Sequence, residues 1–394
     1  MRICLASGWE GLETGGMSAR YVTGMDRLIS ERREVLRGRR VGLVAHPASL
    51  NGRGIHSAQL LQEAEGCTLS ALFSPEHGYF GEAGAGVRVE GELHPHWRIP
   101  VYSLYGESRR PTAGMLGEID VMLVDLQDLS IRCYTYISTL IEVMEACEGA
   151  GVPVVVADRA TPWMHCVDGP DLETGFDSFV GRFPGPMVYG LTPGEAATYL
   201  VEEHGLRVDL TVIPAGLEGR RFAPPMWQWA PPSPALRHGH ATLTYPMLVA
   251  FEAFAGFDVG RGGLLPFEGV TSEGIDGAGW AARLNEENLR GVMFHPLWLT
   301  REGRRLSGIR ISVLDPEGCR PVETAVAILE GARELLGGDG LWKDSGFDER
   351  HFDRLFGTDQ VRMELQRGGS WRDVVEGWDV SAYQVRREPR LLYG

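Results

Sequence analysis

The sequence predicts an α/β protein, in which a Rossmann-like, doubly wound parallel sheet is followed by a second, smaller α+β domain. Between about residues 25 and 213, short apolar runs alternate with amphipathic segments, which is typical of βαβ units. A stretch with five prolines, 224–234, then leads into a less regular remainder. The length of 394 residues is long for one domain and comfortable for two.

The apolar runs give the expected strands of the first domain, at 41–45, 69–73, 101–104, 121–124, 154–157 and 209–213. Helices are expected between them, at 25–36, 55–65, 115–118, 136–149 and 192–204. Thr192, Pro193 and Glu195 match the N-cap, N1 and N3 positions of the last helix. The remainder predicts helices at 245–254 and 321–336 and a strand at 307–313.

These elements divide the chain into three parts. Residues 1–24 are expected to form a disordered or peripheral extension. Residues 25–240 form the Rossmann-like catalytic domain, and residues 241–394 form the α+β domain that closes the cleft.

Composition excludes several classes of function. A net charge of −15 opposes binding to nucleic acid, which requires a basic face, and docking on anionic lipid. No run of 18 apolar residues is present, so no transmembrane helix is expected. No clean signal peptide is visible, which predicts a cytoplasmic location. The six cysteines lack C-x-x-C spacing, and no histidine pair has an obvious third ligand, so neither a metal nor a cofactor is expected.

The most informative segment is FSPEHG at 73–78, because it places Glu76 and His77 just beyond a predicted buried strand. A carboxylic acid and an imidazole on such a loop are placed for acid–base chemistry. The alternative is an N-capping Glu beside a surface His.

Two further strands also end in acids. Asp125 and Asp128 follow the run 121–124, and Asp158 follows 154–157. Ligands of open parallel sheets bind outside the carboxyl ends of the strands, so these acids and Glu76 are expected to share one site.

Other residue types near these ends indicate a sugar as ligand. Tyr134 and Tyr136 follow Arg132 closely, and rings can stack on sugar C–H faces while the charged group bonds hydroxyls. Arg261 lies between glycines and is interpreted as an anion clamp. Trp229 lies beside the proline cluster. Its side chain is interpreted either as part of a rigid cleft wall or as packing in the seam between the two domains.

Taken in order, these segments resemble the NamZ-type exo-β-N-acetylmuramidase family. The matching segments are 41–43, 73–78, 101–106, 125–128, 134–139, 158–159, 169–170, 178–181, 190–195, 231–234, 260–262 and 266–268, with the single residues Pro47, Arg132 and Glu252. The resemblance implies a Rossmann-like first domain, a smaller second domain, and hydrolysis of terminal N-acetylmuramic acid from the non-reducing ends of peptidoglycan chains.

We assign Glu76 as general acid, with Asp125 or Asp128 as the partner carboxylate. His77 would either orient Glu76 or bond a sugar hydroxyl. The 2-acetamido group of the sugar is the alternative nucleophile. Arg132 or Arg261 would pair with the lactyl carboxylate of muramic acid. The expected substrate-binding set is Arg132, Tyr134, Tyr136, Asp158, Arg159, Trp229, Ser233, Glu252 and Arg261.

Three positions depart from the family pattern. Thr161, Ala235 and Ala255 stand where the family usually has Asn, which predicts a substrate that is a modified or peptide-bearing relative of the simple muramide. Two rival functions are a non-catalytic sugar- or muropeptide-binding protein and a metal-dependent hydrolase that uses the aspartates with His77. No feature of the sequence indicates an oligomeric state.

Overall fold

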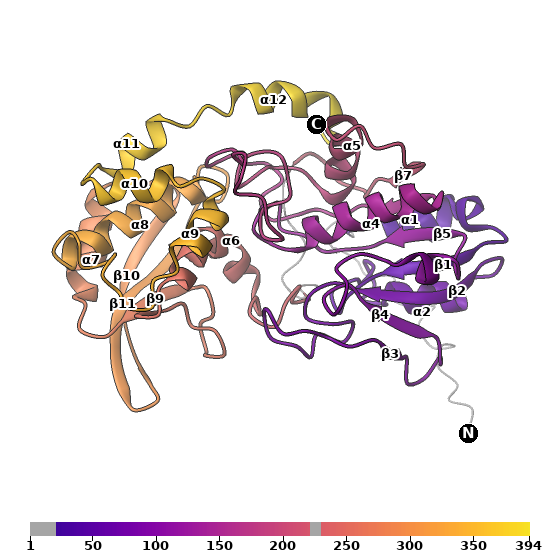
Figure 1. Cartoon of the computed structure of the whole chain (residues 1–394), viewed down its shortest axis with the longest axis horizontal. Coiled ribbons are helices and arrows are strands. Elements are labelled where there is room, and N and C mark those ends of the chain that lie inside the picture. The colour runs from indigo at the N-terminus through magenta and orange to yellow at the C-terminus, as the bar shows by residue number, and fades with distance from the viewer. Residues whose placement is uncertain (1–20, 221–229) are drawn as a thin grey trace, which may run out of the picture.

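The computed structural model describes residues 21–220 and 230–394, which form two domains, each built around its own sheet (Figure 1). Trp229 and most of the expected extension, 1–20, lie outside the described residues. Within the described part, no helix is both long and apolar enough to cross a bilayer.

The first domain contains a seven-stranded sheet with the order β3-β4-β2-β1-β5-β6-β7. All pairs are parallel except that of β3 with β4. The strands are β1 (Arg40–Val44), β2 (Thr68–Ser74), β3 (Glu92–Leu93), β4 (Pro100–Ser103), β5 (Val121–Val124), β6 (Val154–Ala157) and β7 (Leu210–Ile213). Every expected strand is present; β3, at the sheet edge, was not expected.

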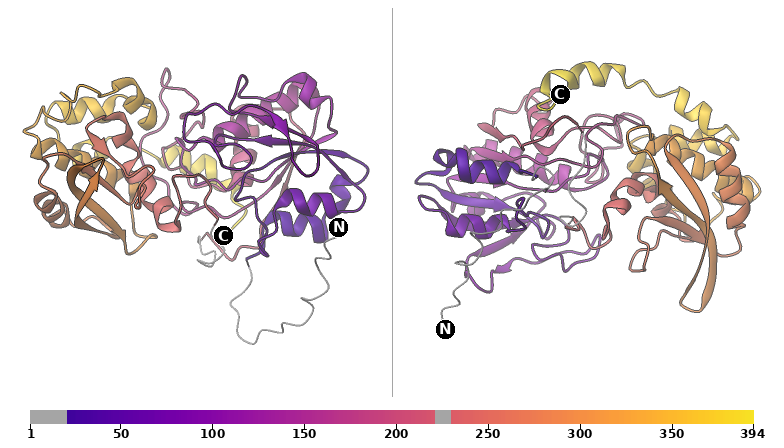
Figure 2. Two further views of the ribbon diagram at one scale, coloured as in Figure 1. Left: turned by 90° about the horizontal axis from the view of Figure 1, so that it is seen from below. Right: turned by 180° about the vertical axis from the view of Figure 1, so that it is seen from behind.

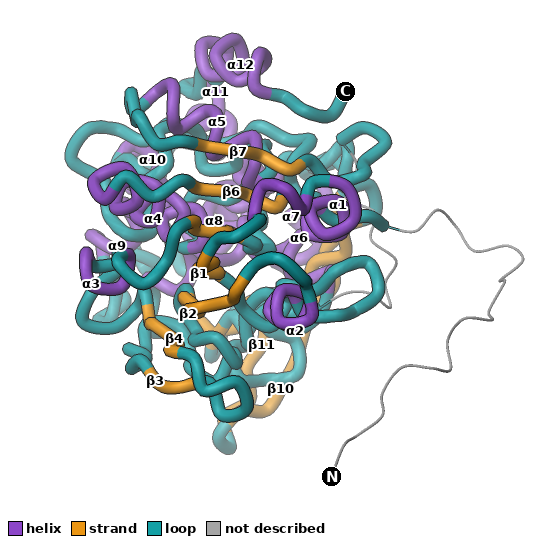
Figure 3. Tube along the Cα trace, turned by 90° about the vertical axis from the view of Figure 1, so that its right-hand side faces the viewer, coloured by secondary structure: helices purple, strands orange, loops and turns teal. Residues whose placement is uncertain are grey.

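Helices cover both faces of this sheet, as the doubly wound prediction requires (Figure 3). Helices α1 (Gly24–Glu31) and α2 (Ser57–Glu63) pack on one face, in a cluster with Leu43 and Leu123. Helices α4 (Tyr136–Ala150) and α5 (Pro193–Glu203) cover the other face. Short helices α3 (Ala113–Leu116) and η1 (Arg33–Leu36) complete the domain, and η1 occupies the end of the helix expected at 25–36. Because both faces are buried, the central strands are apolar throughout.

The second domain is built on a four-stranded antiparallel sheet with the order β10-β11-β9-β8. Its strands are β8 (Phe257–Asp258), β9 (Gly269–Ser272), β10 (Val292–Arg301) and β11 (Arg304–Val313). Its helices are α6 (Gly239–Leu248), η3 (Val249–Ala253), α7 (Gly277–Glu286), α8 (Pro321–Leu335), α9 (Glu349–Phe356) and α10 (Gln360–Gln366). The sequence predicted β11 and α8 but missed β10, because Pro296 interrupts its pattern.

The chain finally returns to the first domain through α11 (Trp371–Glu376), α12 (Ser381–Arg387) and η4 (Glu388–Arg390). These helices arch over both domains and bring the C-terminus beside α5 (Figures 1 and 2). One hydrophobic cluster includes buried residues of both domains, from Val124 on β5 to Phe352 on α9. The two sheets are therefore joined by continuous packing as well as by this returning segment.

Candidate active site

Glu76 lies on the loop after β2, where it is held by two donors. Its side chain is only 6% exposed. Oε1 accepts a hydrogen bond of 2.7 Å from the backbone N–H of Gly86, and Oε2 accepts one of 2.7 Å from Oγ1 of Thr135. Thr135 is the N-cap residue of α4, in the connection that follows β5. Connections that follow two strands of the same sheet, β2 and β5 with β1 between them, thus fix one carboxyl group.

His77 adopts a left-handed backbone conformation, with φ of 77°. Such a conformation is uncommon for a residue with a side chain and persists where the surroundings enforce it. Nδ1 of His77 lies 3.0 Å from the carbonyl oxygen of Ala83. Burial lowers the pKa of His77, and the Glu76 carboxylate beside it offsets this only in part. The imidazole is therefore neutral near pH 7.

Glu76 and His77 line a cavity of about 380 Å³ between the two domains. The first domain also contributes Ala85, Gly86, Tyr105, Cys133, Tyr134, Thr135 and Val180. The other lining residues are Ser233, Ala235, Leu236, Tyr245, Val249, Glu252, Arg261, Phe267, His351 and Leu355. A concave site with few polar groups and several rings is typical of small-ligand binding.

An ion pair from the second domain forms another part of the lining. Nη2 of Arg261 donates to Oε2 of Glu252 at 2.9 Å, and Nε of Arg261 donates to Oε1. Within the described ranges, Nη1 of Arg261 donates to no protein atom. The guanidinium also lies over the Phe267 ring, 5.1 Å from its centroid. Burial acts to lower the pKa of Arg261, but the hydrogen bonds and charge of Glu252 outweigh it and raise the pKa.

Aromatic rings complete the cavity. The Tyr134 ring lies 6.0 Å from that of Tyr245, which in turn lies 4.8 Å from Phe267. Burial raises the pKa of Tyr105, and the nearby Glu76 carboxylate raises it further. These rings offer flat apolar faces beside the Glu76 carboxyl.

Asp125 and Arg159 are not among the cavity-lining residues. They form a buried ion pair, in which Nη2 of Arg159 donates to Oδ2 of Asp125 at 2.8 Å and Nε of Arg159 donates to Oδ1. The hydroxyl of Ser57 also donates to Asp125. The structure thus places Asp125 outside the cavity lining that contains Glu76, where its carboxylate is paired with Arg159.

Asp128 also lies outside the cavity lining, although it is close behind it. Its Oδ2 accepts a hydrogen bond from the hydroxyl of Tyr189, and among the described residues its buried Oδ1 has no partner. Burial raises the pKa of Asp128 to about 6. Its charge in turn contributes to the raised pKa values of Tyr134 and Tyr136.

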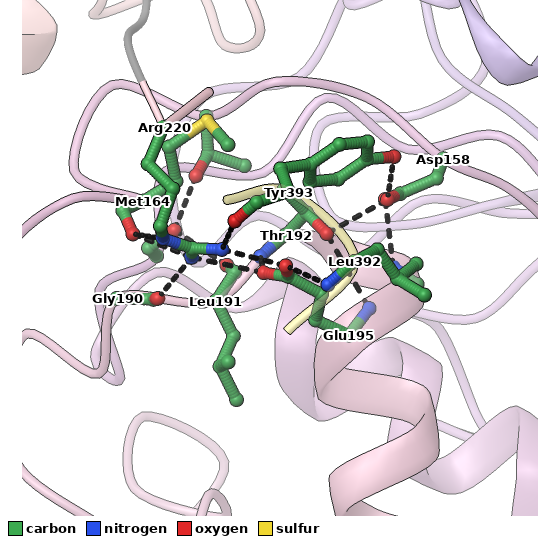
Figure 4. Close-up of polar contacts among 12 residues, drawn as sticks. Asp158, Met164, Gly190, Leu191, Thr192, Glu195, Arg220, Leu392 and Tyr393 are labelled. Atoms are coloured by element: carbon green, nitrogen blue, oxygen red, sulfur yellow. Dashed lines mark hydrogen bonds and ion pairs between the residues drawn. The ribbon is translucent and has the colours of Figure 1, made fainter. Parts of the chain in front are cut away.

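Asp158 is buried in a network that holds the C-terminus (Figure 4). It accepts hydrogen bonds from Oγ1 of Thr192 at 2.7 Å, the backbone N–H of Gly194 at 2.8 Å and the hydroxyl of Tyr393 at 2.6 Å. Burial raises the pKa of Asp158 to about 6, against the effect of these donors. These hydrogen bonds tie Asp158 to the C-terminal segment, and it is not among the cavity-lining residues.

Arg132 and Tyr136 are likewise absent from the lining. Arg132 is fully buried and donates to the backbone carbonyls of Pro170 at 3.1 Å, Gly185 at 2.5 Å and Phe356. Its guanidinium thus joins three backbone segments and does not line the cavity. The hydroxyl of Tyr136 donates to the carbonyl of Pro232 at 2.6 Å, which makes it a support for the loop that carries Ser233.

Several lining residues were not predicted as site residues. Thr135 lies between Tyr134 and Tyr136, in a segment that matches the family pattern, and this position was the available signal. Tyr245 and His351 come from helices α6 and α9, and nothing in their local sequence marks them. Of the three positions where an amide is missing, only Ala235 lines the cavity. Thr161 is buried against Ser130, and Ala255 is exposed.

No cluster of three histidine, cysteine, aspartate or glutamate side chains is placed to hold a metal ion in the described part of the chain.

Comparison with known proteins gives concordant matches along nearly the whole chain. A family model described as exo-β-N-acetylmuramidase NamZ, N-terminal, matches residues 41–240, and its C-terminal counterpart matches 243–393. The peptidoglycan β-N-acetylmuramidase NamZ of Bacillus subtilis strain 168 is 32% identical over 381 residues, which cover 94% of this chain and 91% of that protein.

Two solved structures, both DUF1343 family proteins from Bacteroides fragilis, share the fold. One has a TM-score of 0.87 at 30% identity, and the match covers 96% of this chain and 100% of that chain. The other has a TM-score of 0.75 at 26% identity, and the match covers 95% of this chain and 99% of that chain.

Proposed function

The chain belongs to the exo-β-N-acetylmuramidase NamZ family of glycosidases, and from this premise we propose that the interdomain cavity releases terminal N-acetylmuramic acid from the non-reducing end of peptidoglycan fragments. The observation that carries the proposal is the Glu76 carboxyl, fixed by Gly86 and Thr135 inside a cavity that also contains Arg261. The site thus combines a positioned acid with a cation for an acidic sugar.

Glu76 is proposed to protonate the glycosidic oxygen as the bond from C1 to the leaving sugar breaks. The hydrogen bond from Gly86 fixes the rotation of the carboxyl group, so the remaining lone pairs have a defined direction. His77, neutral and next to Glu76, adds no positive charge that would oppose the positive charge developing on the sugar ring.

The 2-acetamido group of the substrate is proposed as the nucleophile. Asp125 is neutralised by Arg159, Asp128 lies outside the lining, and Glu252 is engaged by Arg261. The acetamido oxygen attacks C1 to form a cyclic oxazolinium ion, while the Glu76 proton moves to the leaving oxygen. Water then attacks C1, and Glu76 takes back a proton from it, which restores the acetamido group and retains the configuration.

Arg261 is proposed to bind the lactyl carboxylate of muramic acid. Its Nη1 is free of protein partners in the described structure, and Glu252 fixes the plane of the guanidinium. A planar guanidinium so held can pair with a second carboxylate through its remaining donors.

The function is tested with Glu76→Gln, which keeps the shape and removes the acid. Release of N-acetylmuramic acid from a fragment with that sugar at its non-reducing end should fall about 10²- to 10⁴-fold. The matched control is Glu82→Gln on the same loop, outside the cavity lining, which should retain the wild-type rate. Circular dichroism checks that both variants fold. A wild-type protein that binds the fragment without turnover would instead indicate a sugar-binding protein.

The nucleophile is tested separately with substrates whose acetamido group carries one to three fluorine atoms. Fluorine withdraws electrons from the carbonyl oxygen, so the rate should fall steeply with each added atom. A rate that is nearly independent of fluorination would assign the attack to a protein carboxylate or to water.

A further inference from the structure

Arg387, the last residue of α12, carries a buried positive charge that no step of the proposed reaction uses. It is 9% exposed and is not among the residues that line the catalytic cavity. Its Nε and Nη1 atoms are buried and have no hydrogen-bond partner, and across residues 21–220 and 230–394 its guanidinium forms no ion pair. Burying an unpaired charge is costly, so a guanidinium in this position indicates a missing anionic partner.

Helix α12 turns Arg387 toward the long loop that follows β6. Tyr383 lies one turn earlier on the same face of the helix, is fully buried, and donates its hydroxyl to the backbone carbonyl of Tyr189 at 2.7 Å. The Arg387 guanidinium lies against the next residue of that loop, because a Cβ atom at Gly190 would come within 2.5 Å of Nη1. Packing of α12 on the loop therefore holds the guanidinium in place.

The carboxylates around Arg387 do not neutralise it. Glu195 is fully buried, but its Oε1 and Oε2 accept hydrogen bonds of 2.6 and 2.9 Å from Arg220 (Figure 4). Glu388 follows Arg387 directly and is exposed to solvent. Burial lowers the pKa of Arg387, and the positive charge of Arg220 lowers it further. An arginine side chain nevertheless stays protonated in proteins, so the charge persists.

A second arginine approaches the same loop from α8. Nη1 of Arg320, the N-cap residue of α8, donates to Sγ of Cys166 at 3.6 Å. Burial raises the pKa of Cys166 to about 12, while the charges of Arg320 and Arg387 both act to lower it. Both guanidinium groups therefore lie near this thiol, which is neutral at ordinary pH. Within the described ranges Arg320 forms no ion pair either, so the region has an excess of positive charge.

We propose that a small inorganic anion, either a halide or an oxyanion such as phosphate, binds to Arg387 beside Gly190 and Cys166. We call this the α12 anion site. Charged N–H donors of a guanidinium are well suited to such an anion. Because Arg387 is almost fully covered, the site admits a small ion and no larger ligand. A bound anion would fasten the returning C-terminal segment to the first domain, whether or not the proposed hydrolysis is correct.

The test compares thermal unfolding of the full-length wild type, Arg387→Met and Arg386→Met. Arg386 is the matched control, since its side chain is 42% exposed and lies 3.3 Å from Glu203. Buffers of one ionic strength contain gluconate, which is too large for the site, or chloride or phosphate. Chloride or phosphate should raise the Tm of the wild type and Arg386→Met about 2–4 °C more than that of Arg387→Met, because the anion binds only the folded state.

Gluconate buffer gives a second comparison. There, Arg387→Met should unfold at the same temperature as the wild type or higher, because it removes a buried charge that has no partner. An equal anion response in the wild type and Arg387→Met would overturn the proposal. An Arg387→Met variant that is less stable by the same margin in every salt would assign Arg387 to packing alone, which also overturns it. A response to only one of the two anions would support the proposal and identify the anion as a halide or an oxyanion.

Crystals of the wild type decide the question if Arg387→Met does not fold. They are soaked in bromide or, separately, in selenate, and anomalous scattering should place at least one of these ions in contact with the Arg387 guanidinium. Neither ion at Arg387 would overturn the proposal. A peak at Arg387 without any anion-dependent difference in Tm between wild type and Arg387→Met would mean an adventitious ion only, and would overturn it as well.

Discussion

Glu76 is positioned by hydrogen bonds from a glycine and a threonine that are separated from it in the sequence by different lengths of chain. Gly86 is ten residues along the same loop and adopts a left-handed φ of 73°, which a side chain would disfavour. Thr135 comes from the connection after β5, 59 residues away in sequence and separated from β2 in the sheet by β1. The loop therefore needs glycine at position 86 for its N–H to reach the carboxyl group.

Ala235 is the residue whose substitution should improve the site. Ala235→Asn restores an amide inside the cavity, and a new hydrogen bond to the sugar of about 0.5–1.5 kcal/mol should raise kcat/KM on a simple aryl muramide roughly 2- to 12-fold. The matched control is Ala255→Asn, which adds the same group at an exposed position outside the lining and should change nothing. Equal effects of the two variants would show that the amide does not act in the cavity.

At the scale of elements, the C-terminal segment is an anchored part of the first domain. Its Tyr393 hydroxyl donates to Asp158 and accepts the backbone N–H of Ala215 at 2.9 Å. Nearby, the N–H of Leu392 donates to Glu195 at 2.8 Å, and Glu195 is paired with Arg220 (Figure 4). This segment connects α12 to the start of α5 and to the end of β6.

Tyr393→Phe should therefore destabilise the protein without blocking catalysis. It leaves the buried Ala215 N–H without its partner and removes one of the two side-chain donors to Oδ2 of Asp158, at a cost of roughly 1–3 kcal/mol in the free energy of unfolding. Urea unfolding measures this. Tyr102→Phe is the control, because the Tyr102 hydroxyl donates to Glu118 in an exposed position, and it should cost less than about 1 kcal/mol. Equal losses of unfolding free energy in the two variants would mean that the buried C-terminal network stabilises the protein no more than an exposed hydrogen bond does.

On the scale of the whole molecule, the site exists only where the two domains meet. The acid comes from the first domain, whereas Glu252 and Arg261 come from the second. The continuous hydrophobic cluster keeps these side chains in register. The acid and the proposed recognition of the substrate charge can therefore be separated by mutation.

Arg261→Ala should selectively reduce activity on carboxylate-bearing sugars. Loss of a charged hydrogen bond of about 1.5–3 kcal/mol lowers kcat/KM on a muramide roughly 10- to 150-fold. The corresponding N-acetylglucosaminide lacks the lactyl group, so its slower hydrolysis, if the wild type shows any, should change far less. Both substrates are measured on one protein preparation, so misfolding cancels. Parallel losses on the two substrates would place Arg261 in a purely structural role.

The strand–helix alternation, the doubly wound class and the position of Glu76 and His77 at a strand end could all be predicted from the sequence. These follow from local patterns of apolar residues and turn formers, which need no knowledge of distant contacts. The family pattern also singled out Arg261 and Glu252 on the far side of the cavity.

Which residues near the strand ends line the cavity could not be predicted from the sequence, because it depends on long-range contacts. Asp125, Asp158 and Arg132 all lie in connections that follow the strands of the first sheet, but each binds a partner that is distant in sequence. Asp125 pairs with Arg159, Asp158 accepts a hydrogen bond from Tyr393, and Arg132 donates to the carbonyl of Phe356. Burying an unpaired charge is costly, so such pairs form wherever the fold brings partners together. Glu76 instead accepts hydrogen bonds from two neutral donors, and among the described residues its carboxylate forms no ion pair with an Arg or Lys side chain. That difference depends on packing across the chain, which local sequence does not encode.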